Sequence, residues 1–443
     1  MKGIKSGRRC LAPAVFISLA VLLTASWASS QEVKEIPAFD KDDRVLILAA
    51  HPDDEAISAG GVIQRALSSG ARLKVVSYTN GDNNEPAFIV YEKRLTFRKG
   101  EFIHMGEVRK DETIKAMRYL GLSEDDLIFL GYPDFGTMEI LTKYWGKTRP
   151  FKSFFARSSK VPYPDCLSPG SPYVGESILG DLKRVIIDFK PTKIFVGHPA
   201  DTNRDHRSCY LFLQIALWDL EGQIARPKVF PCITHVVGWP KPRGYHPELV
   251  LAPPQALTGV VWEKLSLTEN EVEKKRGCIA FYKSQIECDP PYLFTFARKN
   301  ELFGDYPILA LSSQGESAQD GGIEDTLSAV SYTNKDNNLY IRLNLRRKID
   351  KNFGISVFLL GYSRHRAFAE MPKIAVTLGI LGMRIKEKRT PIIIKDARYA
   401  YDGSAILLKI PLAGLGDPDY ILSSARAVRL GYDQTAWRIL KLK

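Results

Sequence analysis

Short apolar runs alternate with amphipathic stretches between Arg44 and about Thr295. The runs are rich in β-branched residues and have the length of buried strands. They are Val45–Ala50, Leu73–Thr79, Leu127–Leu130, Lys193–Gly197 and Lys228–Val237. The stretches between them place apolar residues near helical spacing, as in Ala56–Ser69, Val108–Leu120 and Gly175–Asp188. This alternation predicts an α/β domain with a doubly wound, mainly parallel sheet and helices on both faces.

The pattern changes after about Pro307. Ser312–Thr326 is small and polar, which is typical of a linker. From Leu339 to Arg346 apolar and polar residues then alternate with a period of two, as in a strand with one buried face. Further strand-like runs are Ile355–Leu360, Ile374–Leu381, Pro391–Lys395, Ala405–Ile410 and Ala427–Gly431. A smaller all-β domain, expected to be a sandwich, therefore follows the first one.

The N-terminal residues 1–28 have the composition of a secretory signal peptide. Basic residues precede an apolar run, and small residues placed for cleavage follow it: Lys2, Lys5, Arg8, Arg9, Leu11–Leu23, Ser26 and Ala28. An uncleaved anchor is the alternative, but the run falls short of the roughly 20 apolar residues that a membrane span requires. We therefore expect an exported protein, periplasmic or secreted, with no membrane span after cleavage.

The expected parts are a signal peptide (1–28), an α/β domain (42–305), a linker (306–325) and a β-rich domain (326–443). The formal net charge is +12, and four of the basic residues lie in the leader. The others are scattered and not clustered with aromatic residues, which indicates a solvated surface and no nucleic-acid partner. Five cysteines follow the leader, so at least one is expected to be unpaired.

The first predicted strand ends in a group of polar residues, His51-Pro-Asp53-Asp54-Glu55. A catalytic zinc ion typically takes three protein ligands, with nitrogen and oxygen donors, and leaves one position to water. His51 and Asp54 are three residues apart, so a tight turn can direct both at one ion, with Asp53 beside its water. The alternative is an ordinary helix start, where acidic residues are favoured by the helix dipole.

A second strand end carries similar residues. Lys193–Gly197 is followed by His198, Asn203 and Asp205-His206, and then by an expected helix, Arg207–Leu220. Because the carboxyl ends of parallel strands meet at one edge of a sheet, the two groups can converge on one ion. The alternative is that Asp205 only caps that helix and His206 is a first-turn residue.

The run AHPDDE at 50–55, the pair Gly60-Gly61 and the later Asp205-His206 resemble the LmbE/PIG-L family of zinc-dependent de-N-acylases. Further segments match in order: TNGD at 79–82, VRKDE at 108–112, FLGYPD at 129–134 and KKRGCIAFYKSQ at 274–285. The resemblance covers about residues 42–305. It implies a Rossmann-like fold and one Zn²⁺ per chain.

The resemblance also implies roles for single residues. His51, Asp54 and His206 match the metal ligands, and Asp53 matches the catalytic acid/base. Arg109 and Asp134 fall where the family tends to contact the sugar. The alternative for Arg109 is an ion pair with Glu112 on the helix surface, and the alternative for Asp134 is a turn-forming role. Glu55 is expected to orient its neighbours by hydrogen bonds. The family often has a His three residues before the last ligand, where this chain has Asn203; the oxyanion partner is left open between Asn203 and His198.

The function expected from this resemblance is zinc-dependent removal of an N-acetyl group from an N-acetylglucosamine-type sugar. Export favours an envelope or extracellular glycan as the substrate. Two alternatives remain at this point: an amide hydrolase for another N-acyl metabolite or glycoconjugate, and a non-catalytic glycan-binding protein. No G-x-S-x-G, Walker, G-x-G-x-x-G or H-E-x-x-H pattern indicates a different chemistry.

Overall fold

The computed structural model describes residues 33–83, 89–90, 99–311, 314–323, 327–346, 354–427 and 434–442. The expected signal peptide, 1–28, lies outside these residues. Residues 34–443 form one compact unit. In the described part, no helix has the length and apolar character needed to span a membrane, and all five cysteines are free thiols.

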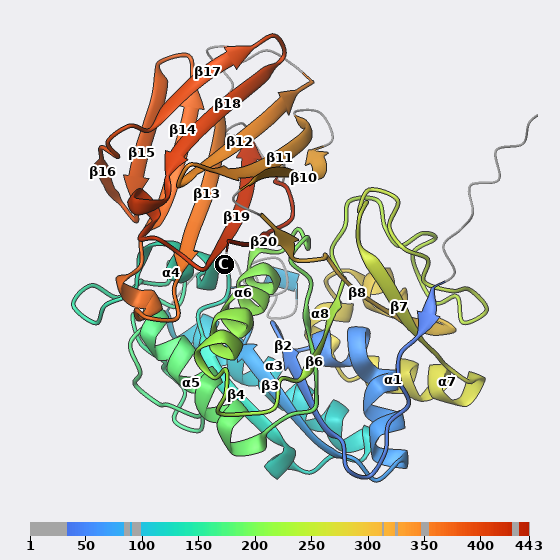
Figure 1. Cartoon of the computed structure of the whole chain (residues 1–443). Helices are drawn as coiled ribbons and strands as arrows, with labels where there is room; N and C mark the ends of the chain where they lie inside the picture. The colour runs from blue at the N-terminus through green and yellow to red at the C-terminus, as the bar shows by residue number, and fades with distance from the viewer. Residues whose placement is uncertain are drawn as a thin grey trace, which may run out of the picture. The chain divides into compact units, whose positions relative to one another are not determined.

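An eight-stranded sheet, in the order β1-β7-β8-β6-β5-β2-β3-β4, forms the centre of the first part of the chain (Figure 1). Strands β6, β5, β2, β3 and β4 are parallel to one another, whereas β8 runs antiparallel to β6 and β7. The strands are β1 (Lys34–Glu35), β2 (Arg44–Ala49), β3 (Arg72–Thr79), β4 (Leu127–Tyr132), β5 (Lys193–Gly197), β6 (Lys228–Cys232), β7 (Val261–Ser266) and β8 (Asn300–Asp305). The α/β fold with a mainly parallel sheet, predicted from the alternation of strands and helices, is confirmed.

Six of the helices associate in two groups: α1, α3 and α7 contact one another, and α4 and α5 both contact α6. They are α1 (Asp54–Ser68), α3 (Lys99–Leu120), α4 (Thr137–Lys143), α5 (Gly175–Phe189), α6 (Arg204–Asp219), α7 (Glu269–Ile279), α8 (Lys283–Ile286) and α9 (Pro290–Phe294). Strands β3 and β4, which follow β2 in the sequence, lie on one side of β2 in the sheet, whereas β5 and β6 lie on its other side. The carboxyl ends of β2 and β5 therefore form the topological switch point, where α/β folds usually bind ligands.

Two further sheets form the C-terminal part, with strand orders β10-β11-β12-β18-β17 and β16-β15-β14-β13-β19-β20-β9. Their strands are β9 (Leu309–Ala310), β10 (Gln314–Ile323), β11 (Leu327–Lys335), β12 (Asn338–Leu345), β13 (Ile355–Tyr362), β14 (Lys373–Gly379), β15 (Gly382–Glu387), β16 (Thr390–Ile392), β17 (Arg398–Asp402), β18 (Ala405–Pro411), β19 (Tyr420–Ala427) and β20 (Arg438–Lys441). The two sheets share one apolar core. In β12 this core takes Leu339, Ile341 and Leu343, as the period of two predicts.

The expected linker, 306–325, is partly strand, since it contains β9 and β10. Strand β10 pairs antiparallel with β11 at the edge of its sheet. An edge strand is held by backbone hydrogen bonds and can be polar, so its sequence resembles that of a loop. Of the strand expected at Ala427–Gly431, only Ala427 lies among the described residues, and it is the last residue of β19.

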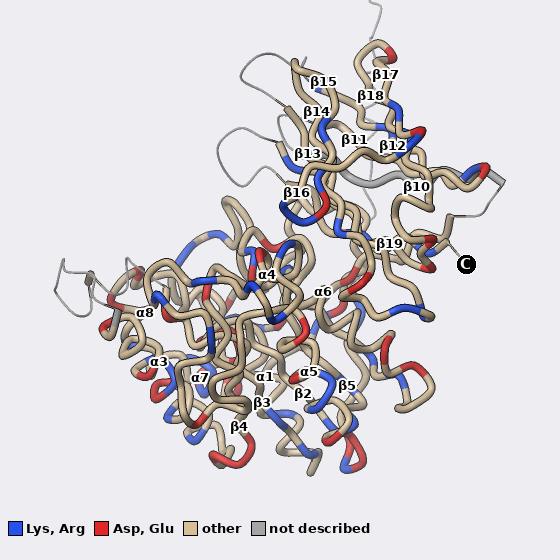
Figure 2. Tube along the Cα trace, turned by 90° about the vertical axis from the view of Figure 1, so that its left-hand side faces the viewer, with Lys and Arg blue, Asp and Glu red and all other residues tan. Residues whose placement is uncertain are grey.

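The α/β part and the C-terminal sheets share a second apolar core. Trp145 and Phe212 of the first part lie in one buried cluster with Phe368, Tyr420 and Trp437 of the second. The rings of Trp218 and Tyr420 stack with centroids 4.6 Å apart. In Figure 2, basic and acidic segments are intermixed over the trace and do not form a single charged block.

Candidate metal centre and active site

The turn between β2 and α1 is held by its own residues. The backbone N–H of His51 donates to Oδ2 of Asp54 at 2.8 Å, and the N–H of Asp53 donates to Oε2 of Glu55 at 3.1 Å. Asp53 has a φ of 119°, a conformation that is costly for a residue with a side chain. Such strain persists where the surroundings impose it, often at functional sites.

The loop between β5 and α6 brings a second histidine to the same place. Asn203 caps α6 by accepting a hydrogen bond from the Asp205 N–H at 2.8 Å, so His206 lies in the first helical turn. Gly197 allows this helix to lie against the end of β5, since a Cβ there would come within 2.8 Å of the His206 Cβ.

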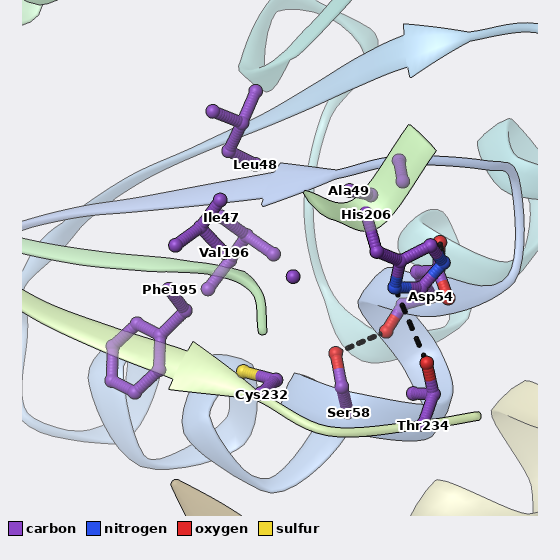
Figure 3. Close-up of a pocket in the computed structure, with 12 residues that line it drawn as sticks. Ile47, Leu48, Ala49, Asp54, Ser58, Phe195, Val196, His206, Cys232 and Thr234 are labelled. Atoms are coloured by element: carbon purple, nitrogen blue, oxygen red, sulfur yellow. Dashed lines mark hydrogen bonds and ion pairs between the residues drawn. The ribbon is translucent and has the colours of Figure 1, made fainter. Parts of the chain in front are cut away.

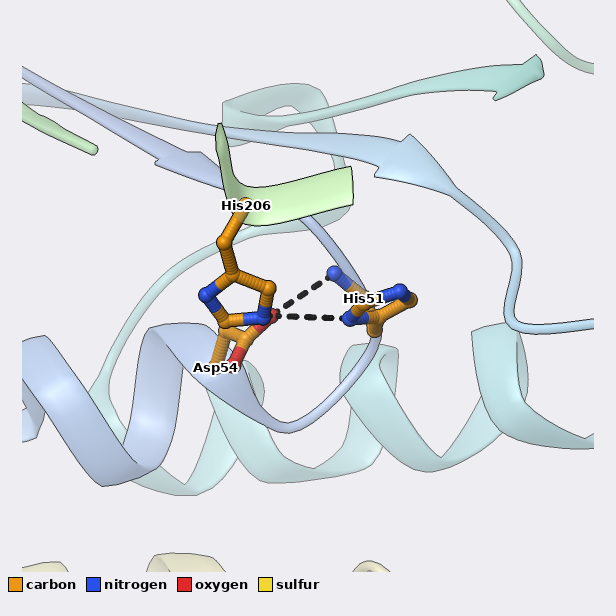
Figure 4. A group of neighbouring side chains, drawn as sticks. All are labelled: His51, Asp54 and His206. Atoms are coloured by element: carbon orange, nitrogen blue, oxygen red, sulfur yellow. Dashed lines mark hydrogen bonds and ion pairs between the residues drawn. The ribbon is translucent and has the colours of Figure 1, made fainter. Parts of the chain in front are cut away.

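His51, Asp54 and His206 converge at the switch point (Figure 4). Each offers a ligand atom, and these atoms all lie within 4.8 Å of one another. Oδ2 of Asp54 is 3.1 Å from Nε2 of His206 and 3.3 Å from Nδ1 of His51. All three side chains are buried. The structure therefore brings together the three residues that the resemblance implies as ligands.

Two other groups of side chains in the described residues have a similar geometry. They are Asp201 with His206 and His235, and His51 with Asp134 and Asp205. However, Asp201 accepts hydrogen bonds from Thr234 and His235, and Asp205 accepts them from residues 135 and 137. Carboxylates that are already saturated with donors are weaker metal ligands than one with an open oxygen.

The first group has the open atoms that a metal ion needs. Oδ1 of Asp54 and Nε2 of both His51 and His206 are buried without a hydrogen-bond partner among the described residues. A buried polar atom without a partner is costly, and a bound cation would remove that cost. The donor set of two imidazoles and one carboxylate is one that zinc accepts. The residues present therefore fit a metal ion.

The charges in this cluster depend on one another. Burial favours neutral forms, but the imidazoles of His206 and His51 outweigh it and hold the pKa of Asp54 well below its usual range. Burial also lowers the pKa of His51, and Asp134, Asp205 and Asp54 together raise it well above the ordinary value. The carboxylate and histidines thus form a strongly polar centre inside the protein.

A cavity of about 710 Å³ opens over this cluster. His51 and Asp53 form part of its wall, together with Ile57, Asn83, Arg109, Asp134, Phe135, Phe155, Thr202, Asn203, Arg204, His235, Gln285, Cys288, Asp289, Tyr292 and Leu293. A volume of this size accommodates a sugar or other small molecule. Behind the cluster, Ser58 and Thr234 contact Asp54 and His206, respectively, and close its inner side (Figure 3).

Arg109 contacts the turn and not the helix surface. Its Nη2 donates to the Pro52 carbonyl at 2.8 Å and lies 3.3 Å from Oδ2 of Asp53, while Nη1 donates to the Gly81 carbonyl at 3.1 Å. The side chain is buried, and Glu112 accepts its hydrogen bonds from Ser284 instead. Arg109 therefore positions Asp53 as well as lining the cavity.

Asp53 faces the cavity beside the cluster. Burial raises its pKa to about 8 against the opposing effect of the Arg109 guanidinium. A divalent cation beside it would lower that pKa, because positive charge favours the carboxylate. Glu55 is fully buried and also accepts hydrogen bonds from Thr113 at 2.9 Å and Tyr282 at 2.6 Å. Because Glu55 also accepts the hydrogen bond from the Asp53 N–H, it links Asp53 to these two residues, and we expected Glu55 to orient its neighbours by hydrogen bonds of this kind.

Asp134 lies beside the cluster as well as in the cavity wall. Its Oδ1 is 3.2 Å from Nε2 of His51, and its Oδ2 accepts from the Asn83 N–H at 3.3 Å. It can thus contact either a ligand histidine or a bound substrate.

The two candidates for the oxyanion role differ in position. Asn203 lines the cavity. His198 does not: its ring stacks on Trp262 with centroids 5.7 Å apart, and its Nδ1 accepts from the Ala200 N–H at 3.0 Å. The proposed alternative role of His198 is therefore corrected, because its fully buried ring packs against β7 and away from the reacting centre.

His235 is a cavity residue that the sequence reasoning missed. It lies three residues after the end of β6 and lines the cavity, and the centroid of its ring is 4.8 Å from that of His206. The available signal was a third strand ending in a polar pair, Thr234-His235, after β2 and β5. The strand was expected to continue to Val237, which placed His235 inside it; β6 instead ends at Cys232.

Comparison with known proteins places this site in a family. Residues 46–217 match the family described as PIG-L, GlcNAc-PI de-N-acetylase. A 1D-myo-inositol 2-acetamido-2-deoxy-α-D-glucopyranoside deacetylase from Streptomyces griseus is 37% identical over 113 residues, which are 24% of this chain and 32% of that protein. The enzyme of the same name from Corynebacterium efficiens is 35% identical over 80 residues, 18% of this chain and 25% of that protein.

The chain thus spans about a third or less of the length of these relatives. Among solved structures, it is similar to an N,N'-diacetylchitobiose deacetylase from Pyrococcus horikoshii, with a TM-score of 0.37 and 17% identity over 59% of this chain and 82% of that one. The matched segment, 46–217, contains the turn after β2 and the loop after β5, and with them all three cluster residues. Residues 46–217 of this chain are a domain of the PIG-L/LmbE deacetylase family.

Proposed function

We propose that the chain is a zinc-dependent N-deacetylase acting on an N-acetylglucosamine-type sugar. The observation that carries the proposal is the cluster of His51, Asp54 and His206, from which His51, with the neighbouring Asp53, lines a cavity large enough for a sugar. The names of the matched family and of the relatives, which specify acetamido sugars, support this substrate class.

His51, Asp54 and His206 would hold one zinc ion. When bound, zinc polarises an amide carbonyl and lowers the pKa of water to about 7. Asp53 would accept the proton from the attacking water and return it to the departing amine. Arg109, 3.3 Å from the Asp53 carboxylate, keeps that side chain directed at the cavity. The products are acetate and a free amino sugar.

We also propose that the protein acts outside the cytoplasm, on an envelope or extracellular glycan. The basic and apolar pattern of residues 1–28 supports export. An N-acetylated glycan is then the available class of substrate. Other N-acyl conjugates remain as competing substrates in the same assay.

Acetate release from a panel of substrates tests the proposal. The panel holds N-acetylglucosaminyl oligosaccharides, GlcNAc-inositol and N-acylated compounds that are not sugars. The full chain with zinc should release acetate from the acetamido sugars, lose activity with a chelator and regain it with zinc. Activity restricted to the non-sugar amides would contradict the substrate class.

Variants separate metal binding from proton transfer. His51→Ala should lose both metal and activity, since it removes a ligand. Asp53→Asn should keep the metal and lose about 10²–10⁴ in turnover, the usual contribution of a general acid–base. His104→Ala, a change at an exposed position on α3, is the control and should keep both. Wild-type turnover by Asp53→Asn would refute the assigned role of Asp53.

A further inference from the structure

Phe135 occupies a turn position that a bulky side chain seldom takes. The chain turns between Pro133 and Gly136, whose N–H donates to the Pro133 carbonyl at 3.1 Å. Phe135, the third residue of this turn, has a φ of 55°. A type II turn has a positive φ at its third residue and usually has glycine there. This conformation is costly for phenylalanine, and such a residue persists where its surroundings impose it, often at a functional site.

The backbone of this turn is fixed by the loop that supplies the metal cluster. The Phe135 N–H donates to Oδ2 of Asp205 at 2.6 Å, and the N–H of Thr137 donates to Oδ1 of the same carboxylate at 3.2 Å. The turn is also tightly packed, because a Cβ at Gly136 would come within 2.6 Å of the Phe151 ring. Phe135 therefore has a defined position next to the loop that carries His206.

The side chain of Phe135 lies in the cavity wall and remains accessible there. The residue is 52% exposed. The other two phenylalanine and tyrosine residues of the wall have ring partners: Phe155 stacks on Phe102 with centroids 4.7 Å apart, and Tyr292 stacks on His235 at 5.8 Å. Among the described residues, none is recorded in a ring contact with Phe135. Its exposed surface is thus available to a molecule in the cavity.

Polar groups lie directly beside this apolar surface. Asp134, the preceding residue, has its Oδ1 3.2 Å from Nε2 of His51, and it also accepts a hydrogen bond from the Asn83 N–H. Asp134 and Asn83 line the same cavity as Phe135. A pyranose ring has C–H groups on its faces and hydroxyl groups around its edge, so it needs an apolar surface with polar groups beside it. The neighbouring Asp134 and Phe135 provide this combination close to the metal cluster.

We propose that Phe135 is the surface on which the pyranose ring of the acetamido sugar packs. This inference rests on the proposed deacetylase function and adds to it a residue that recognises the sugar ring. The contact involves a part of the sugar that does not react, so it is the same in the bound substrate and in the transition state. It should therefore lower KM and leave kcat unaffected.

The test compares full-length, zinc-loaded Phe135→Gly and Phe135→Tyr with the wild type. Phe135→Gly removes the ring and gives the turn a residue that suits its backbone. Its KM for an N-acetylglucosaminyl oligosaccharide should rise about tenfold, the order expected when one face of an aromatic ring is no longer buried by the ligand. Its kcat and its bound zinc should stay near the wild-type values. Phe135→Tyr keeps the ring and should therefore keep a KM near that of the wild type.

Thermal unfolding distinguishes this role from a structural one. Glycine adopts a positive φ readily, and the Phe135 ring is half exposed, so Phe135→Gly should melt at or above the wild-type temperature. A clear fall in its melting temperature would show that the ring mainly stabilises the fold, and would overturn the inference.

Lys190→Gly is the matched control for the backbone. Lys190 follows α5 with a φ of 53° and is exposed. It precedes β5, so it lies at the opposite end of the strands from the cavity. Lys190→Gly relieves the same kind of backbone conformation and should also melt at or above the wild-type temperature, with an unchanged KM. A rise in its KM like that of Phe135→Gly would overturn the inference, because the effect would then not be specific to the cavity.

The two reaction products add a test that separates the sugar ring from the acetyl group. Glucosamine has the ring and no acetyl group, whereas acetate has the acetyl group and no ring. Phe135→Gly should weaken glucosamine binding, measured by calorimetry, by about the factor by which it raises KM. Inhibition of turnover by acetate should stay unchanged. Equal weakening for both products would show that the variant disturbs the whole site, and would overturn the inference.

The outcomes separate the two proposals. If the zinc-loaded wild type releases acetate from no acetamido sugar, the proposed function fails, and the role of Phe135 fails with it. If the wild type is active and Phe135→Gly keeps its KM and its affinity for glucosamine, only the inference on Phe135 is overturned. Loss of zinc in Phe135→Gly would also overturn it, since the residue would then act by holding the metal loop.

Discussion

The two loops that supply the metal cluster are built in different ways. The turn after β2 has hydrogen bonds between residues no more than three positions apart, from His51 to Glu55, besides those that it accepts from Arg109 and Tyr282. The loop after β5 depends on distant segments: Asp201 binds Thr234, and Arg207 donates to the Thr435 carbonyl at 3.1 Å. The Pro199 carbonyl accepts from the Trp437 N–H at 3.0 Å. Both loops also contact distant residues of the α/β part, but among the described residues only the loop after β5 is recorded to bond to the C-terminal part as well.

The largest expected effect is that of Trp437→Ala, which removes a buried ring from the core shared by the two parts. Truncation of a buried Trp usually costs about 3–5 kcal/mol. We expect a loss of this size in the free energy of unfolding, measured by denaturant titration, together with weaker zinc binding because the loop after β5 is loosened. Trp437→Phe is the matched control and should lose less, since most of the ring volume remains.

If Trp437→Ala kept both its stability and its zinc affinity, the loop after β5 would not depend on the C-terminal sheets, and the contrast between the two loops would be wrong.

An intermediate effect is expected for Asp201→Asn. Oδ2 of Asp201 is 3.5 Å from Nδ1 of His206, the position of a group that orients a metal-ligating histidine. Loss of such a partner typically costs about 10–100-fold in metal affinity. Zinc competition with a chromogenic chelator measures it. Asp134→Asn is the matched change next to His51. It should lower the metal affinity less, because the turn after β2 also holds His51. An equal or greater loss of metal affinity would show that the two loops do not differ in this respect.

The smallest effect concerns the cap of α6. Asn203→Ala removes the acceptor for the Asp205 N–H and should lower the free energy of unfolding by about 1 kcal/mol. Asn203→Ser provides another capping oxygen and should restore most of this loss. Thermal unfolding of the two variants beside the wild type tests the assignment, and equal melting temperatures for Ala and Ser would show that the cap contributes nothing.

The same contrast explains what could be predicted from the sequence. The strand before His51 and the turn itself are encoded within about ten residues, so pattern and spacing were enough to propose His51 and Asp54. His206 required the additional assumption that β2 and β5 are neighbours, which the strand pairing confirms.

Long-range contacts account for what was missed. His235 could not be assigned, because its position depends on Asp201, 34 residues away. Strands β7 and β8 were not expected either: β7 is mostly exposed or half-buried, and β8, although buried, contains Asn, Glu, Gly and Asp. Their pairing with each other, not their own pattern, makes them strands.

The backbone of Asp53 has a consequence for how this protein can be improved. A φ of 119° suits glycine far better than aspartate, so a glycine at this position is expected to make the fold more stable. The same change would remove the carboxylate on which turnover is proposed to depend. Selection for thermal stability alone would therefore favour an inactive enzyme at residue 53, and a stabilised variant has to gain its stability elsewhere in the chain.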